Sequence, residues 1–289
     1  MSRFRLDGAT LWLLRGCGVL TGALVLLVVA HLVVESLPAL RSIGPARFVT
    51  DSGWSPTSRG EADAARFDLS PMLIGSLAAT SGAILLAAPL GLISAIFCRF
   101  YAPRALARSY RRWLELLAGI PSVVYGLWGL VVLAPLIRRI APPGTSLLAG
   151  ILILALMCLP TIALLSEAAL RNVPRAYLDG AAALGLSRWG TVRRVALPAA
   201  RDGVGIAIAL GTARAIGETM AVLMVCGNVV RVPDSVFDPV RTLTANIALE
   251  LGYAAGDHRS ALFVSGLVLM ASVVALVGVS DRLRRKATP

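Results

Sequence analysis

Long runs of apolar residues, separated by short polar and arginine-rich stretches, dominate the chain. Each run is long enough to cross a bilayer as a helix, which takes about 20 mostly apolar residues. The runs predict six spans at Leu11–Leu37, Met72–Phe97, Trp113–Ile137, Ser146–Leu170, Gly203–Val229 and Ala261–Ser280. The pattern therefore predicts an all-α integral membrane protein with six transmembrane helices.

An even number of spans places both termini on the same side of the membrane. Basic residues collect on cytoplasmic loops, and more of them lie on the side of the termini, including the tail "DRLRRKATP". We therefore expect cytoplasmic termini. We divide the chain into residues 1–70, holding the first span and a long outer loop, and residues 71–289, a five-helix core that includes an inner loop at 171–202.

Composition agrees with this class. The chain is 57% hydrophobic and only 15% charged, whereas soluble domains carry about 25% charged residues. The net charge of +12 follows from the cytoplasmic loops, so membrane lipid rather than nucleic acid is the expected partner. The four cysteines lie in or beside apolar runs, with no CxxC and only two histidines. No metal site is therefore expected.

The inner loop at 171–202 has the pattern of two short helices joined by a turn. Pro174 suits a helix start, residues 176–184 favour helix, and Gly185 suits a helix end. Pro198 is expected to stop the second segment.

This loop resembles the EAA signature of permease subunits in ATP-binding-cassette importers. Asp179, Gly180 and Ala181 stand at its first three places, and Gly185 stands at its glycine. Nine residues later the segment ends in Leu197 and Pro198. Asp replaces Glu and Gly replaces Ala, which loosens the helix by up to about 1 kcal/mol. The resemblance implies a type I importer permease fold, in which these residues form a coupling helix that docks on an ATPase.

Further stretches narrow the family. "ELLAGIPSVVYGLWGL", "GTARAIGETMAV" and "TLTANIA" are similar to the phosphate-specific Pst importers, and most similar to their C-type permease subunit. The resemblance implies import of inorganic phosphate across the bacterial cytoplasmic (inner) membrane. It also implies a periplasmic phosphate-binding protein, a second permease forming a heterodimer, and two ATPase subunits that carry ATP and magnesium.

The chain itself is expected to be no enzyme and to hold no cofactor. A P-loop needs a lysine within G-x4-G-K-[ST], and the only lysine, Lys286, lies in the tail without such a motif. ATP hydrolysis therefore requires a separate subunit.

Two charges stand inside the fifth apolar run. Arg214 and Glu218 are four residues apart, so on one helix they share a face. Two interpretations are open, an internal salt bridge and a lining of the anion path, where arginine's planar fork suits an oxyanion. Ser122 and Tyr125 follow Pro121, where a broken helix could expose backbone groups to a cavity; helix packing is the alternative. Glu115 and Glu167 are expected to pair with arginines at the inner ends of the spans.

Other functions stay open at this point. Another oxyanion, such as phosphonate, sulfate or molybdate, would suit the same chemistry. A proton-coupled secondary transporter would use Glu218 as a proton site but would leave the coupling loop unexplained. An intramembrane enzyme is disfavoured because neither HExxH nor GxSxG occurs.

Overall fold

A computed structural model describes residues 2–57 and 65–286. Its helices are α1 (Ser2–Ser42), α2 (Arg47–Thr50), α3 (Ser70–Ile96), α4 (Arg104–Gly119), α5 (Ser122–Trp128), α6 (Ala134–Arg138), α7 (Leu147–Arg171), α8 (Arg175–Ala183), α9 (Arg188–Thr191), α10 (Leu197–Ile216), α11 (Met220–Val225), α12 (Leu243–Glu250) and α13 (Gly256–Lys286). There are three π-helical turns. η1 (Phe97–Tyr101) follows α3, η2 (Gly129–Leu133) joins α5 to α6, and η3 (Val192–Ala196) joins α9 to α10.

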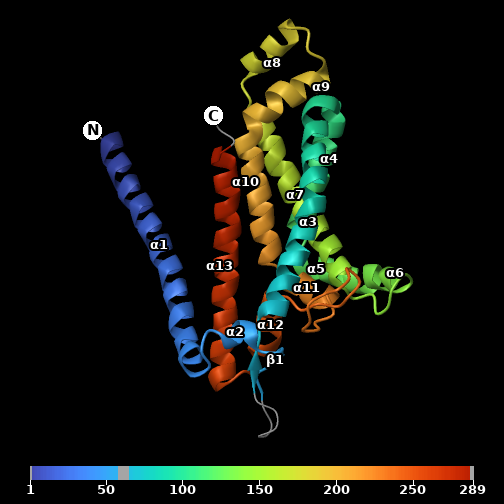
Figure 1. The fold of residues 1–289 in the computed structure, drawn as a ribbon. Helices are drawn as coiled ribbons and strands as arrows, with labels where there is room; N and C mark the ends of the chain where they lie inside the picture. Colours follow the sequence, from blue (N-terminus) through green and yellow to red (C-terminus); the bar gives the residue numbers. More distant parts are fainter. Residues whose placement is uncertain (1, 58–64, 287–289) are drawn as a thin grey trace.

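The long helices α3, α7, α10 and α13 run side by side, and α4 lies along the same bundle (Figure 1). Five helices of the described chain are long and apolar enough to cross a membrane, and a bent pair brings the number to six. α1 begins and α13 ends at the end of the bundle that carries α8 and α9 (Figure 1). Six spans are therefore confirmed when the bent pair counts as one span, and the two described ends of the chain lie at the same end of the bundle.

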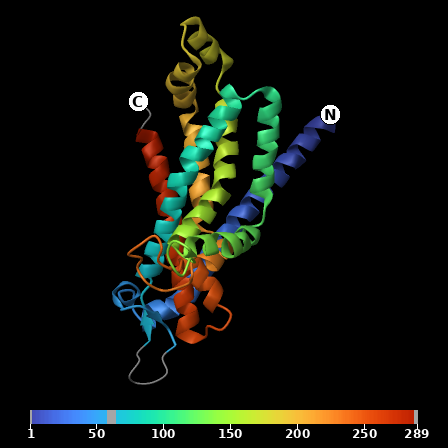
Figure 2. The same ribbon diagram turned by 90° about the vertical axis from the view of Figure 1, so that its right-hand side faces the viewer.

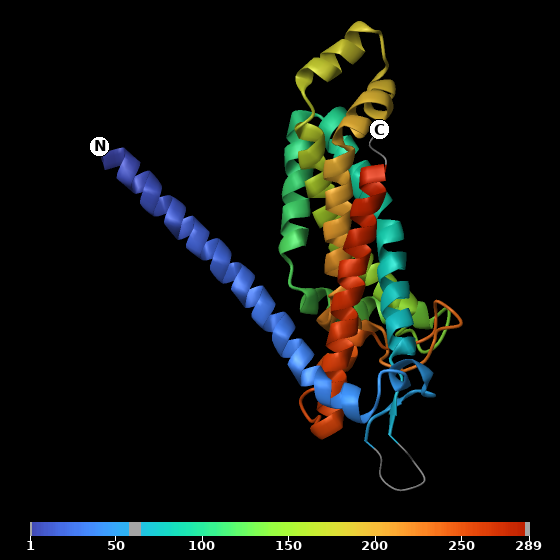
Figure 3. The same ribbon diagram turned by 60° about the vertical axis from the view of Figure 1, so that its left-hand side comes forward.

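The centre of the bundle is built from small side chains. Ala83 and Ala87 of α3 are fully buried in the same cluster as Ile153 and Ile162 of α7. Gly211 of α10 faces the same helix, and a methyl group there would lie 2.7 Å from Cγ1 of Ile162. Without water to drive association, helices in a membrane depend on such close packing. α1 is the exception, since its first half leans away from the other helices (Figure 3).

The third span is not one helix, which corrects the prediction of a continuous Trp113–Ile137. α4 ends at Gly119, Ile120 and Pro121 are extended, and α5 with α6 continues at 91° to α4. Figure 2 shows α5 and α6 lying across the bundle instead of along it. The physical cause is Pro121, which lacks an amide hydrogen and disfavours helix at the residue before it.

The fifth span also differs from its predicted bounds. Helix runs from Arg188 through α9, η3 and α10 to Ile216, so Pro198 does not stop it and Val229 is not reached. Pro198 sits in the first turn of α10, directly after the π-helical turn. That turn shifts the hydrogen-bond register, so the missing amide of the proline no longer breaks the helix.

The opposite end of the molecule is a cap of short elements. It contains α2, α12 and two paired strands, β1 (Trp54–Ser55) and β2 (Arg66–Phe67). Glu250 of α12 holds the cap together: it pairs with Arg241 at 2.7 Å, and its second oxygen lies 2.7 Å from Trp54 Nε1 and 2.9 Å from His258 Nε2. Trp54 is 196 residues from Glu250 in the sequence, so the cluster ties β1 to α12 and α13.

Candidate functional site

The stretch that holds Arg214 and Glu218 contains a helix end. α10 stops at Ile216, and Gly217 follows as its cap. Glu218 is therefore off the helix, and its carboxylate accepts a hydrogen bond from the Ala221 amide at 3.2 Å, in the first turn of α11. The predicted shared helix face is wrong, and the described part of the chain has no ion pair between Arg214 and Glu218. The local cause is Gly217, which favours a helix end, followed by a carboxylate that satisfies a free amide of the next helix.

Arg214 is exposed and Glu218 is half-buried. The backbone at the break is fixed from the cap side, because Thr244 Oγ1 donates a hydrogen bond to the Glu218 carbonyl at 2.7 Å. Sequence reasoning missed Thr244. The sequence does carry a signal for the start of α12, because threonine is a common helix N-cap. Thr242 is that N-cap, and its hydroxyl accepts a hydrogen bond from the Ala245 amide. Thr244 therefore lies in the first turn of α12.

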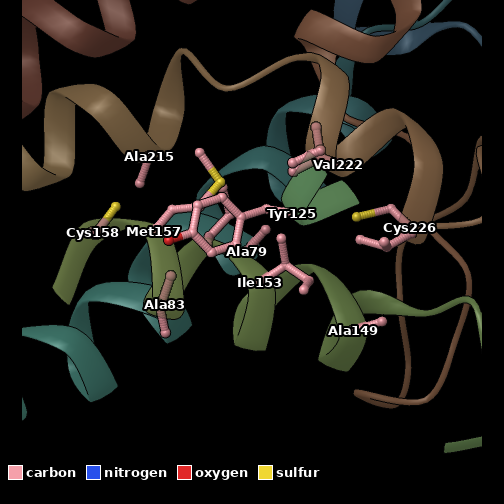
Figure 4. Packing of buried hydrophobic residues seen from close by; sticks show 14 of the residues in the cluster. Ala79, Ala83, Tyr125, Ala149, Ile153, Met157, Cys158, Ala215, Val222 and Cys226 are labelled. Atoms are coloured by element: carbon pink, nitrogen blue, oxygen red, sulfur yellow. The ribbon is translucent and has the colours of Figure 1, made fainter. Parts of the chain in front are cut away.

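The second helix break carries the other two predicted residues. Ser122 is half-buried and begins α5. Tyr125 is 5% exposed, and its hydroxyl donates to the Leu117 carbonyl at 2.8 Å, across the bend. Figure 4 shows its ring among Ala79, Met157 and other apolar side chains of the core. In this conformation the Leu117 carbonyl accepts from the Ile120 amide at 3.2 Å as well as from Tyr125, so the hydroxyl ties the start of α5 to the end of α4.

The two breaks lie close to each other. α5 packs on α11 so tightly that a methyl group at Gly126 would lie 2.9 Å from Cα of Ala221. Tyr125 shares one buried cluster with Cys158 of α7, with Ala215, next to Arg214, and with Ala221, which bonds Glu218. The structure therefore brings Arg214, Glu218 and Tyr125 into one region, where two discontinuous helices meet and one guanidinium is accessible.

The coupling loop has the predicted helix–turn–helix form. α8 ends in a Schellman motif, in which the Gly185 amide donates to Ala182 at 2.9 Å and the Leu186 amide to Ala181 at 3.1 Å. Gly185 has φ +71°, a left-handed conformation that glycine adopts without strain. Asp179 and Gly180 are exposed, while Ala181 is 3% exposed and faces the protein.

The loop also presents large apolar side chains to the outside. Tyr177 is 56%, Leu184 82% and Trp189 55% exposed. We call these three residues, with Asp179 and Gly180, the coupling surface. Figure 1 shows α8 and α9 projecting beyond the ends of the other helices, so this surface is accessible to another protein. Leu197 and Pro198 lie behind it, in the first turn of α10.

The predicted ion pairs of Glu115 and Glu167 with arginines are confirmed. Arg111 contacts Glu115 at 2.9 Å and Glu167 at 3.2 Å, and Arg171 contacts Glu167 at 2.5 Å. The predicted absence of a metal site stays a prediction; in the described residues no group of three or more His, Cys, Asp or Glu side chains is placed to hold a metal ion.

Comparison with known proteins extends this description. Residues 87–288 match the family described as "Binding-protein-dependent transport system inner membrane component". The chain is 41% identical to the probable ABC transporter permease protein YqgH of Bacillus subtilis, over 80% of this chain and 75% of that protein. It is 35% identical to the phosphate transport system permease protein PstC of Mesorhizobium japonicum, over 88% of this chain and 82% of that protein.

Solved structures agree on the fold. A bacterial ABC transporter involved in alginate import superposes with a TM-score of 0.67 at 14% identity, over 99% of this chain and 100% of that chain. The MetNI methionine ABC transporter superposes with a TM-score of 0.59 at 21% identity, over 76% of this chain and 94% of that chain. The overall fold is thus that of type I ABC-importer permeases.

Proposed function

Because the chain belongs to the family of inner-membrane components of binding-protein-dependent transport systems, we propose that it is the permease subunit of an ATP-driven importer of inorganic phosphate. As a member of this family it is a multi-pass membrane transport subunit and not an enzyme. The single observation that carries the choice of phosphate is the similarity to permeases named for phosphate transport, over most of both chains. The accessible Arg214 at the meeting point of two helix breaks is consistent with an oxyanion substrate.

Arg214 is the residue that contacts the passing anion. Its planar guanidinium can donate two parallel hydrogen bonds to phosphate oxygens, and in the free chain it is exposed and not paired with Glu218. Glu218 is fixed nearby by Ala221 and Thr244. Its negative charge weakens the attraction of Arg214 for phosphate, so that the anion can leave, as conduction requires. Ser122 lines the same path at the start of α5.

Tyr125 contributes in a different way from the one expected. Its hydroxyl is bonded to the Leu117 carbonyl, so it keeps α5 at its angle to α4 and thereby shapes the path. Discontinuous helices of this kind form the substrate sites of many transporters, because their unpaired backbone groups face a cavity.

The coupling surface docks on a separate ATPase, which carries ATP and magnesium. Exposed aromatic and aliphatic side chains on a short, well-capped helix suit a protein interface. Since the coupling surface, the start of α1 and the end of α13 share one end of the bundle, all three are cytoplasmic and the cap around α12 is periplasmic. The complete importer contains two ATPase copies, a second permease that differs from this chain, and a periplasmic phosphate-binding protein, in the bacterial inner membrane.

Co-purification with these partners, followed by ATP hydrolysis assays, tests the proposal. Phosphate with its binding protein should stimulate hydrolysis, whereas sulfate, molybdate and a phosphonate should not. Stimulation by one of those anions instead of phosphate would assign the chain to another oxyanion importer. Purification without any ATPase subunit would contradict the proposal as a whole.

A further inference from the structure

A cavity lined by arginines lies at the inner end of the bundle, away from the two helix breaks. Its volume is about 570 Å³, and it is bounded by the end of α3 with η1, by the start of α4, by the end of α7 and by the first residue of α8. The charged side chains that line it are Arg99, Arg104, Arg108, Glu167, Arg171 and Arg175.

The positive charge of this cavity is largely uncompensated. Glu167 is its only carboxylate, and that carboxylate is already shared by Arg171 and by Arg111, which lies outside the lining. Among the ion pairs of the described residues, none involves the other four arginines of the lining. Like charges brought together without counterions repel, so an arrangement of this kind favours a bound anion.

Arg99 gives an independent indication of a ligand. Its Nε is buried and finds no hydrogen-bond partner within the described residues, although its guanidinium lies 5.6 Å from the centre of the Phe100 ring. Buried N–H groups nearly always donate a hydrogen bond. An acceptor atom of a bound anion would satisfy this one.

The backbone explains why Arg99 points here. Residues 97–101 form the π-helical turn η1 at the end of α3. A π turn rotates the side chains that follow it relative to an α-helix, and such turns are frequent at functional sites. In η1, Cys98 and Arg99 both line the cavity.

We propose that this cavity binds a phosphate group on the cytoplasmic side, carried either by an anionic phospholipid or by free inorganic phosphate. Several arginines around one polar cavity at a helix-bundle end suit a group with two or three acceptor oxygens. Because Arg175 begins α8, the bound group touches the base of the coupling surface. Occupancy would therefore stiffen the attachment of α8 to α4 and α7.

This inference does not depend on which anion is transported, since the cavity shares no lining residue with the region of Arg214 and Glu218. The experiment uses the assembled importer in nanodiscs, with Arg214→Gln in every sample so that phosphate in the transport path does not contribute. One arm measures equilibrium binding of radiolabelled inorganic phosphate in discs of phosphatidylcholine alone. The other arm measures retention of phosphatidylglycerol by native mass spectrometry from mixed discs.

Arg99→Gln and Arg108→Gln are the test variants, and Arg112→Gln is the control. Arg112 is an exposed residue of α4, so its replacement removes the same charge from the same inner end without altering the cavity. We expect each test variant to bind one of the two probes at least about tenfold more weakly, as loss of one charge-assisted hydrogen bond implies. The control should bind like the protein with Arg214→Gln alone.

The arm that responds identifies the source of the phosphate group. If Arg99→Gln prevents assembly, Arg108→Gln still decides, because Arg108 is an exposed side chain. Equal affinity of the test variants and the control for both probes would overturn the proposal. In that case the proposed transport function would stand, because it rests on other residues.

Discussion

Replacing Glu218 by Gln separates the two roles that the structure gives this residue. The carboxylate accepts a hydrogen bond from the Ala221 amide at 3.2 Å, and Glu218 lies two residues beyond the end of α10, whose last turn carries Arg214. Glutamine keeps an acceptor oxygen but loses the charge. Glu218→Ala loses both and is the matched control.

The effect of each Glu218 substitution on the free energy of unfolding can be estimated from the hydrogen bond between the Ala221 amide and the Glu218 carboxylate. A typical hydrogen bond contributes about 0.5–1.5 kcal/mol, and a charged acceptor roughly doubles its strength. Since Glu218→Gln retains the bond, it should lower the free energy of unfolding by less than about 1 kcal/mol. Glu218→Ala should cost about 1 kcal/mol more, as loss of a helix cap does.

The effect on transport should be larger. Without the negative charge, Arg214 holds phosphate more tightly, so release slows. We expect the maximal uptake rate of Glu218→Gln to fall at least about tenfold, equivalent to about 1.4 kcal/mol, with a lower half-saturating concentration. Uptake of labelled phosphate into proteoliposomes gives the maximal rate and the half-saturating concentration, and thermal unfolding of the same samples gives the change in stability. Normal uptake by Glu218→Gln together with impaired uptake by Glu218→Ala would show that the carboxylate acts only as a cap.

Four further outcomes follow from the packing and the charges. Gly211→Ala should destabilise the protein by about 1–3 kcal/mol, because its methyl group would lie 2.7 Å from Ile162; thermal unfolding measures this, and Gly119→Ala, where a methyl group meets nothing within 4 Å, is the control. Gly180→Ala should stabilise α8 by up to about 1 kcal/mol, since its position is equally open; thermal unfolding measures this, and a lower melting temperature would contradict it. Glu250→Gln should destabilise the cap by about 3–5 kcal/mol, because the guanidinium of Arg241 stays charged and loses its carboxylate partner; faster proteolysis of the cap reports it, and unchanged proteolysis would contradict the role of the cluster. Asp51 is partly desolvated, which raises its pKa, but hydrogen bonds from Arg47 and the Phe67 amide outweigh this and hold the pKa below the ordinary 3.8. Its contribution to stability is therefore present above about pH 4 and lost as the pH falls through the lowered pKa, so Asp51→Asn should lower the melting temperature at pH 7 and progressively less as the pH falls below about 4.

The sequence pattern was sufficient to predict the number of spans, because length and hydropathy alone decide whether a helix can cross a membrane. It did not predict the 91° bend in the third span or the bounds of the fifth. The turn at Gly185 was predicted for a similar reason, since glycine alone adopts its φ of +71° without strain. Local signals failed where tertiary contacts decide. The end of α10 at Ile216 is stabilised by Thr244 from a later helix, and the spacing of Arg214 and Glu218 gives no sign of it.

The cap illustrates the same limit. Glu250 meets Trp54, which is 196 residues away, and such a contact follows from the arrangement of the helices and not from any local motif. The basic cavity was also beyond sequence reasoning, because its arginines come from four elements that only the bundle brings together.

Uptake of radiolabelled phosphate by the reconstituted importer tests the central claim most directly. The complex of both permeases, the ATPase and the phosphate-binding protein is placed in proteoliposomes, with or without ATP and with or without a proton gradient. We predict uptake that requires ATP, that is indifferent to the proton gradient, and that falls sharply in Arg214→Lys, which cannot donate two parallel hydrogen bonds from one plane. Uptake that persists without ATP and collapses with the proton gradient would contradict the account, as would undiminished uptake by Arg214→Lys.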